Sequence, residues 1–473
     1  MKRILIPLFV MTGCAVGPNY KPPENTVSEH WVTEGDSSEP VQNDWWESFH
    51  DPLLSKYIHE ARQHNNDVLT AMSNILQARA LRQIEASAFY PQLSALVNAT
   101  KTYFSKNGPV FSLSTPETSG LPYAVQVPQI QNLFNFLFDA SWEIDIFGKT
   151  RRKVQAAEAV IGRTIAQKDD ILISVFSELA RTYMELCAVR ERKEIIKENI
   201  SLLESKSCLI RLQYRLGYVN RIDDESVQAA AFAERAKLPP LESEMYHHIY
   251  TISVLIGKPP EALLEELLLY KPLPPLPEKV AVGLRSDLLR RRPDIRKAER
   301  ELAGATAQIG VAIAQFFPTF SLTGDGGLQS LSIGSLFSPK SLTYAFGGGL
   351  NAPIFQGWQY LGNLHARRAE EAAKFTAYAG TVLQALQEAE SALMAYNKDL
   401  KSLSDTQLET KHQKEATYLV GERNIKGLVS ALEVFNAKLQ LSGVQLSLLD
   451  HELKTRIDLI SLYKALGGGW QSS

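Results

Sequence analysis

The spacing of hydrophobic residues changes along the chain from a helical period to an alternating period and back, and it does so twice. Leu53–Phe89 and Asp287–Phe317 carry alanine, leucine, arginine and glutamine at helical spacing, and they stop at Pro91 and Pro318. Residues three and four apart share one face of a helix, so each stretch predicts one helix. An alternating segment follows each helix.

The alternating segments predict four β-strands, two in each half of the chain. In the clearest one, Leu133–Phe147, the even positions are apolar and most odd positions are polar. Leu342–Phe355 repeats this pattern, and Leu93–Tyr103 and Phe320–Leu328 show it more weakly. Alternate side chains point to opposite faces of a strand, so we expect one apolar and one polar face.

These strands are long, and polar loops at 105–132 and 330–341 link them in pairs. Strands in soluble sheets have a mode of about 5–6 residues, whereas outer-membrane barrels need about 9–11. We therefore favour a membrane barrel over the alternative, a half-buried antiparallel sheet on a soluble core. The smallest barrels use about eight strands, so several chains must combine. The candidates for lipid-facing side chains are Phe134, Phe136, Phe138, Trp142, Tyr344 and Phe346.

A very long helix is predicted after the second strand of each half. Lys149–Leu216 and Trp358–Lys426 contain no proline, and each would reach roughly 100 Å at the usual helical rise. The apolar positions of the first step by alternating threes and fours, as in a coiled coil; they are Leu172, Val175, Leu179, Thr182, Leu186 and Val189.

Each long helix ends at a glycine turn, and a second helix returns from it. The turns are at Gly217 and Gly427. The first return begins at Ile222 and is interrupted at Pro239–Pro240, and the second runs from Leu428 to about Leu466.

The chain is a tandem duplication. Asp67–Pro91 matches Asp294–Pro318 at an offset of 227, and Gly217–Asp223 matches Gly427–Glu433 at an offset of 210. Repeats of this kind define the organisation of the whole fold. The expected parts are a signal peptide at 1–13, an N-terminal segment at 14–51, a first repeat at 52–270 with its hairpin at about 92–147, a proline-rich joint at 271–284, a second repeat at 285–466 with its hairpin at about 319–355, and a tail at 467–473.

Composition and charge exclude several classes of protein. The chain of 473 residues has 50 Lys and Arg against 52 Asp and Glu, which argues against nucleic-acid binding. The run Arg290–Arg292 is better explained as a solvated or salt-bridged helix start. The adjacent His247 and His248 diverge on a helix and predict no metal site. No pattern predicts a cofactor or a catalytic constellation, so we do not expect an enzyme.

The N-terminus is typical of a secretory leader. Lys2 and Arg3 precede the apolar stretch Ile4–Val10, and small residues lead to Cys14. This arrangement resembles a bacterial lipoprotein signal, in which Cys14 would become the lipidated first residue; the alternative is a buried free cysteine. Cys187 and Cys208 lie on one predicted helix and are too far apart to pair.

Seven strings in order resemble the outer-membrane efflux factors, the TolC-like channels, and among them the NodT-type lipoproteins of RND efflux systems. One is Trp142–Lys149, with the letters WEIDIFGK, and another is Asp287–Ile295, with DLLRRRPDI. Directly after the string that ends at Gly357, Trp358 occupies a position where these efflux factors commonly have a second glycine. The remaining strings are Gly13–Pro23, Trp45–Leu53, Leu255–Pro260, Gln308–Pro318 and Pro353–Gly357.

The resemblance implies a mixed α+β membrane channel. Three chains with four strands each would form a 12-stranded transmembrane β-barrel, continued by a long periplasmic α-helical coiled-coil barrel, with an equatorial region between. The homotrimer would be lipid-anchored in the outer membrane. It would conduct drugs, toxic compounds or metal ions passively to the exterior. Its implied partners are a periplasmic adaptor (membrane fusion) protein, an inner-membrane RND-type pump and outer-membrane lipid.

The resemblance also implies roles for the helical turns. Acidic residues after the second glycine ring the closed entrance in TolC-like channels; here Glu433 matches one acidic position and Asn436 replaces the other. Such a ring would make the entrance cation-selective. The candidates for the adaptor-docking tip are Gly217, Tyr218, Val219, Asn220, Gly427, Leu428, Val429 and Ser430.

Other functions stay open from the sequence. One is the outer-membrane duct of a type I protein secretion system, which is the same kind of channel with a different cargo. A periplasmic coiled-coil scaffold without a pore would share the long helices but would not explain the strand hairpins. A helical periplasmic enzyme would need a polar pocket that no motif indicates.

Overall fold

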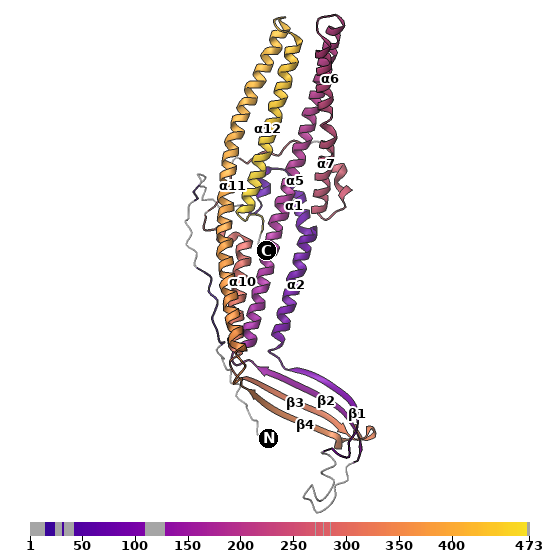
Figure 1. The fold of residues 1–473 in the computed structure, drawn as a ribbon, viewed down its shortest axis with the longest axis vertical. Coiled ribbons are helices and arrows are strands. Elements are labelled where there is room, and N and C mark those ends of the chain that lie inside the picture. The colour runs from indigo at the N-terminus through magenta and orange to yellow at the C-terminus, as the bar shows by residue number, and fades with distance from the viewer. Residues whose placement is uncertain are drawn as a thin grey trace, which may run out of the picture. The chain divides into compact units, whose positions relative to one another are not determined.

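The computed structural model describes residues 15–23, 31–32, 42–108, 128–269, 271–277, 279–283 and 285–470. The chain forms two compact units, and Figure 1 labels their elements. Unit 1 comprises Met1–Lys21, Gln77–Ile161 and Glu301–Phe375, and unit 2 comprises Pro22–Leu76, Gly162–Arg300 and Thr376–Ser473. Both halves of the duplication therefore contribute to each unit.

Unit 1 contains one antiparallel sheet of four strands in chain order, β1 (Gln92–Tyr103), β2 (Ile130–Ile144), β3 (Thr319–Ser330) and β4 (Leu342–Asn351). The prediction of two strands in each half is confirmed. The β2–β3 pairing joins the two halves, with Asp139 directly opposite Asp325.

Two of the predicted strands, those corresponding to β2 and β4, extended too far at their C-terminal ends. β2 ends at Ile144, not at Phe147, because the Asp145 carboxylate turns to accept the backbone N–H groups of Thr150 and Arg151 at 3.1 and 2.9 Å. It thereby caps the start of α5 (Lys149–Arg215). β4 ends at Asn351, not at Phe355, since Pro353 has no N–H to donate to a sheet.

The long helices agree with the prediction to within a residue at each end. They are α5 and α11 (Gln359–Ile425), and the six predicted seam residues of α5 are all buried. The returning helices are α6 (Arg221–Arg235), α7 (Leu238–Leu255) and α12 (Ala431–Ala465). The predicted interruption near Pro239 is confirmed, since α7 begins one residue before it, where a missing N–H costs no hydrogen bond. α12 begins after Leu428, its predicted start.

The two leading helices were predicted to be continuous, and this was wrong. The first is split into α1 (Pro52–His64) and α2 (Asn66–Ser87), and the second into α9 (Leu288–Arg291) and α10 (Pro293–Ala314). The residues at the breaks, Asn65 and Arg292, have extended backbone with ψ of 130° and 122°. Proline at 293 disfavours helical geometry for Arg292. The ends of α2 and α10 also lie a few residues before Pro91 and Pro318.

The aromatic residues near the N-terminus anchor the core of unit 2. The short 3-10 helix η1 (Trp45–Phe49) buries both of its tryptophans. Trp45 stacks on Tyr463 of α12 at 5.3 Å between ring centroids, and Trp46 meets Phe176 of α5 edge-on at the same distance. The segment that precedes the first repeat is thus packed against both returning and outgoing helices.

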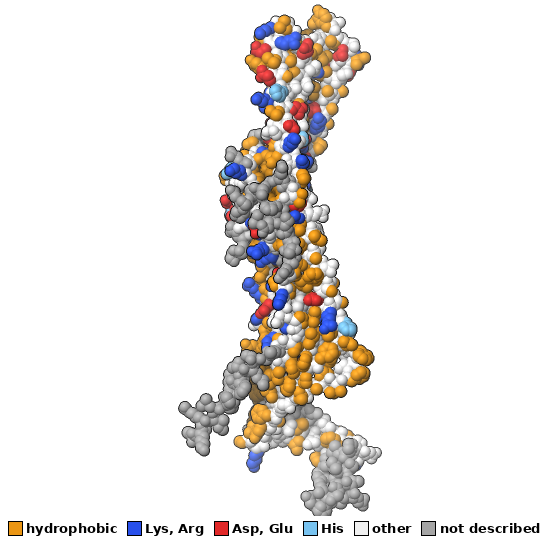
Figure 2. Space-filling view, turned by 90° about the vertical axis from the view of Figure 1, so that its left-hand side faces the viewer, with side chains coloured by type: hydrophobic (Ala, Val, Ile, Leu, Met, Phe, Trp, Pro, Cys, Tyr) orange, Lys and Arg blue, Asp and Glu red, His pale blue; other side chains and the backbone are white. Residues whose placement is uncertain are grey.

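Side-chain chemistry differs between the helices and the sheet. On the face shown in Figure 2, charged side chains are spread over the upper and middle parts of the view, and hydrophobic side chains gather towards its lower part, where few charged side chains are seen. No helix in the described part of the chain contains an 18-residue stretch apolar enough to span a membrane.

Candidate channel sheet and helical tips

The strand register gives the sheet one apolar and one polar face. Phe138 of β2 lies opposite Gly326 of β3, and Gly326 lies opposite Tyr344 of β4. By the same pairing, the even positions of β2 share the apolar face with Phe346. This face therefore brings together all six candidate lipid-facing residues, which are Phe134, Phe136, Phe138, Trp142, Tyr344 and Phe346.

Aromatic side chains on the apolar face are open to the surroundings of the chain. Phe346 is 84% exposed and Tyr344 is 70% exposed. Near the end of β2, the Trp142 indole N–H donates to the Phe89 carbonyl at 3.0 Å. An aromatic ring with an apolar body and one satisfied polar atom is suited to a membrane–water interface.

The polar face contains a chain of amides that the sequence did not single out. Asn135 donates to the Asn98 side chain at 2.7 Å and accepts from Gln329 at 2.9 Å, which connects β1, β2 and β3. The alternation placed Asn135 on the polar face, but only the register shows which strand neighbours reach it. Because these amides satisfy one another, they fix that register across the β2–β3 junction.

The residues that directly follow Cys14 are held in place within unit 1 by hydrogen bonds. Val16 donates to the Phe147 carbonyl at 3.0 Å, and the Arg152 guanidinium donates to the carbonyls of Val16 and Gly17, both at 2.9 Å. Gly17 has φ of 91°, and a Cβ there would lie 2.6 Å from Gly310 Cα, so only glycine fits. Cys14 itself lies outside the described residues.

Both helical turns have the same capped geometry. Gly217 and Gly427 have φ of 80° and 69°, in the left-handed region that favours glycine. Asn220 then caps α6, and Ser430 caps α12 through the Glu433 backbone N–H at 3.4 Å. Exposed hydrophobic side chains surround the turns; they are Leu216, Tyr218 and Ile222 at the first and Ile425 and Leu428 at the second.

The two candidate constriction residues both lie on the first turns of α12 and are exposed. Asn436 accepts a hydrogen bond from Lys206 of α5 at 2.7 Å. The amide that stands in place of the second expected acid therefore contacts a lysine on the neighbouring long helix. Glu433 contributes the single carboxylate at this end of α12.

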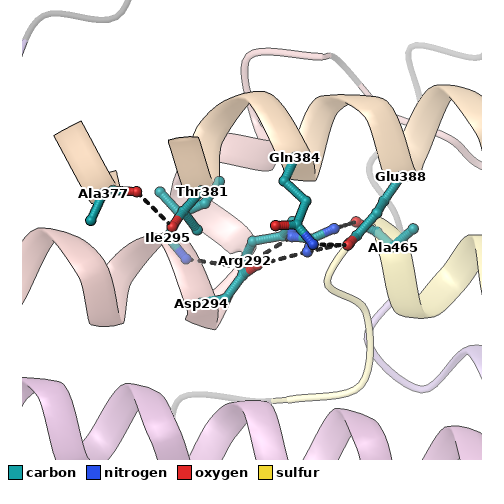
Figure 3. A network of polar contacts seen from close by, with 8 residues as sticks. All are labelled: Arg292, Asp294, Ile295, Ala377, Thr381, Gln384, Glu388 and Ala465. Carbon is teal, nitrogen blue, oxygen red and sulfur yellow. Dashed lines mark hydrogen bonds and ion pairs between the residues drawn. The ribbon is translucent and has the colours of Figure 1, made fainter. Parts of the chain in front are cut away.

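A buried arginine occupies the break between α9 and α10 (Figure 3). Arg292 bonds Asp294 at 2.7 Å and Glu388 of α11 at 2.7 Å, and it donates to the Ala465 carbonyl at the end of α12 at 3.0 Å. Burial opposes the charge, but the bonds to the two carboxylates outweigh it and raise the pKa of Arg292. Of the two roles predicted for the arginine run, solvated or salt-bridged, Arg292 has the salt-bridged one.

In the first repeat, a neutral side chain makes the equivalent contact between the break in the leading helix and the end of the returning helix. Asn65 donates to the Leu255 carbonyl at the end of α7 at 2.9 Å. The offset of 227 residues between the repeats relates Asn65 to Arg292, and the offset of 210 residues relates Leu255 to Ala465. Each returning helix is thus tied at its end to the break in its leading helix. The repeat offsets were the signal that could have found this pair.

Comparison with known proteins agrees with this architecture. The sequence profile of the family described as outer membrane efflux protein matches residues 57–258 and 284–468. Nodulation protein T of Rhizobium leguminosarum bv. trifolii is 28% identical over 94% of this chain and 93% of its own length. The toluene efflux pump outer membrane protein TtgC of Pseudomonas putida is 27% identical over 99% and 95%.

Solved structures of outer-membrane channels have the same fold. OprN matches 97% of this chain and all of its own with a TM-score of 0.86 and 25% identity. The open-state MtrE channel of Neisseria gonorrhoeae matches 96% of this chain and 98% of its own with a TM-score of 0.80 and 27% identity.

The four-stranded sheet with one apolar face, two long helix hairpins and their duplication define a TolC-like outer-membrane channel protein. The chain belongs to the outer membrane efflux protein family. It is an outer-membrane efflux channel with a periplasmic extension, and the resemblance of the seven sequence strings to the outer-membrane efflux factors is confirmed.

Proposed function

We propose that three copies of this chain close a 12-stranded barrel and act as the exit duct of a tripartite pump. The observation that carries the proposal is the sheet: β1 and β4 are its outer strands, so each has one row of unpaired backbone groups. Joining β4 of one copy to β1 of the next removes these edges, and the apolar face then meets lipid. The chain acts as a conduit and catalyses no reaction.

Toxic organic compounds are the cargo that the relatives favour. Two relatives are named as toluene and antibiotic efflux pump outer membrane proteins. By analogy, this channel would pass apolar and amphipathic toxic compounds that an inner-membrane RND-type pump delivers through a periplasmic adaptor. The energy for transport would come from the pump, since a passive duct only lowers the barrier to exit.

A lipid anchor at Cys14 would fit the local geometry of unit 1. The Val16 backbone N–H donates a hydrogen bond to the Phe147 carbonyl, close to the end of β2. An acyl chain two residues earlier would therefore begin near the level at which the strands leave the membrane. Replacement of Cys14 by serine should remove lipid labelling while the protein still inserts, because the strands provide a separate source of membrane affinity.

The helical tips are the proposed surface for the adaptor. Tyr218 is 78% exposed and Leu428 is 64% exposed, beside backbone turns that glycine and cap residues hold rigid. Rigid turns with apolar side chains can bind a partner at little cost in conformational entropy. The tip residues Gly217–Asn220 and Gly427–Ser430 would supply the contact.

Glu433 is the proposed charged residue of the channel entrance. In a trimer it would contribute three carboxylates around one axis, and such rings favour cations. Replacement of Glu433 by glutamine should weaken cation selectivity in planar bilayers without changing trimer stability. Unchanged selectivity would remove Glu433 from the constriction.

The experiment that tests this function combines export with partner identification. Deletion of the gene should raise cellular accumulation of a fluorescent apolar dye, and the wild-type chain should restore export. Crosslinking in living cells should then capture an adaptor and an RND-type pump, and replacement of Tyr218 and Leu428 by aspartate should reduce that capture. Capture of a protein-secretion ATPase, with unchanged dye export, would overturn the proposal.

A further inference from the structure

Two carboxyl groups face each other across the helix hairpin formed by α11 and α12. Asp399 lies on α11, and Asp458 lies near the C-terminal end of α12. Lys454, one helical turn before Asp458 on α12, donates a hydrogen bond to Asp399, which places the two carboxyl groups next to each other. One oxygen of each acid, Oδ2, is buried and has no hydrogen-bond donor among the described residues. Figure 1 shows the two helices running side by side over this stretch.

Few charged groups surround the pair. Lys454 of α12 bonds Asp399 Oδ1 at 3.0 Å, and its side chain is 63% exposed. His451, also on α12, lies beside Asp399, and its Nδ1 is 3.3 Å from Ser402 Oγ. Lys454 thus compensates one negative charge, that of Asp399. Two ionised carboxylates would each present only acceptors to the other, which leaves both buried oxygens unsatisfied.

We propose that Asp399 and Asp458 share one proton, and that this proton fastens α12 to α11 in a pH-dependent way. With the proton present, the acid on one residue donates to the carboxylate on the other, and Lys454 balances the remaining charge. Without it, two like charges lie side by side in a partly buried site and repel each other.

The protonation energetics agree with this arrangement. Burial, followed by the bond to the neighbouring carboxylate, raises the pKa of Asp458 to about 7. The hydrogen bond from Asp458 and the contact with Lys454 lower the pKa of Asp399. An acid whose pKa is raised on folding stabilises the fold at low pH, and this contribution is lost as the pH rises through about 7. The hydrogen bond between Asp399 and Asp458 therefore holds α12 against α11 in mild acid and is lost in mild alkali.

The first repeat has a titratable side chain at the equivalent position. The offset of 210 residues between the repeats relates His248 to Asp458. Its Nδ1 is 3.8 Å from Glu185 of α5, and its Nε2 is 3.7 Å from Glu244. Both returning helices thus place an ionisable group against a carboxylate of their long helix at the same point of the repeat.

The position of the pair suggests its effect on the channel, an effect that rests on the proposed function. α11 and α12 form one hairpin that carries the Gly427 turn and Glu433 at its far end. Asp458 lies in the last turns of α12, so the pair is roughly 40 Å along the hairpin from the Gly427 turn. Release of the pair frees the base of the hairpin to move, so we expect easier opening of the entrance in mild alkali.

Infrared titration of the full-length protein in detergent tests the shared proton directly. The wild type should lose the C=O band of one protonated carboxyl group with a midpoint near pH 7. Asp458→Asn should remove this band, because the amide donates permanently to Asp399. The control is Asp450→Asn, also on α12, where the exposed acid pairs with Arg192; it should keep the band. A wild type without a carboxyl group titrating near pH 7, or an unchanged band in Asp458→Asn, would overturn the shared proton.

Bilayer conductance and hydrogen exchange then separate the fastening from its role in the channel. From about pH 6 to about pH 8, wild-type amides of 449–465 should lose protection, and the open probability should rise several-fold. Both should be independent of pH in Asp458→Asn. Lost protection without a change in open probability would refute the role in opening, whereas unchanged protection would refute the fastening itself. A protein without any conductance would instead contradict the proposed function.

Discussion

At the residue scale, two glycines with the same backbone geometry differ in what surrounds them. Gly257 and Gly217 have φ of 76° and 80°. A Cβ at Gly257 would lie 2.2 Å from the His64 carbonyl oxygen at the end of α1, whereas no described atom lies within 4 Å of the corresponding point at Gly217. The first glycine is required by packing and by conformation, and the second by conformation alone.

This difference predicts unequal costs for the same substitution. Gly217→Ala should lower the free energy of unfolding by about 1–2 kcal/mol, the usual cost of a left-handed L-residue. Gly257→Ala should cost several kcal/mol more, because backbone atoms of α1 must move as well. Thermal unfolding followed by circular dichroism measures both. Equal losses in the two variants would show that α1 does not pack on Gly257.

The two helix-end fastenings should differ in their response to salt. Arg292→Gln can keep a bond to the Ala465 carbonyl but loses the ion pairs with Asp294 and Glu388, so we expect a loss of about 2 kcal/mol. High salt should reduce that loss, because it screens partly exposed ion pairs. Asn65→Ala, the matched change in the first repeat, should cost about 1–2 kcal/mol at any salt concentration. A loss that is independent of salt in Arg292→Gln would exclude an ionic role.

At the element scale, the two faces of the sheet should tolerate charge very differently. Phe136→Asp puts a carboxylate on the apolar face of β2, and this should cost about 2 kcal/mol in each chain if that face meets lipid. Ser141→Asp, on the polar face of the same strand, should be tolerated. Outer-membrane fractionation measures insertion. Equal insertion of the two variants would contradict the assignment of the faces.

The elements show how far the sequence could be interpreted. The four strands, the two long helices and the three returning helices were predictable, because period two and period 3.6 persist over many residues. The breaks at Asn65 and Arg292 were not predicted. The hydrophobic pattern around Asn65 is compatible with a continuous helix. The Leu255 carbonyl, which accepts the hydrogen bond from the Asn65 side chain, is 190 residues away in the sequence. The break at Arg292 could have been inferred from Pro293 alone.

The candidate sites divide in the same way. The apolar face of the sheet and the capped glycine turns follow from local patterns, and the structure brings their residues together. The amide chain through Asn135 and the acid pair of Asp399 and Asp458 depend on which strands and helices are neighbours. Nothing in the local sequence around either acid distinguishes it from an exposed helix residue.

At the scale of the whole molecule, the duplication explains why one chain is incomplete. Each repeat supplies one strand pair, and the two pairs join through β2 and β3 into a sheet with two open edges. Closure into a 12-stranded barrel needs three such sheets, so the protein mass of the membrane-inserted form should be three times the 52.7 kDa of the chain. A water-soluble monomer would be inconsistent with the exposed apolar face.

The most direct test of the channel is single-channel recording in planar lipid bilayers with the purified full-length protein. We predict discrete steps of ion current from the wild type and none from Phe136→Asp, which should not insert. A wild-type trimer that inserts into the bilayer but passes no current at either mildly acidic or mildly alkaline pH would contradict the account.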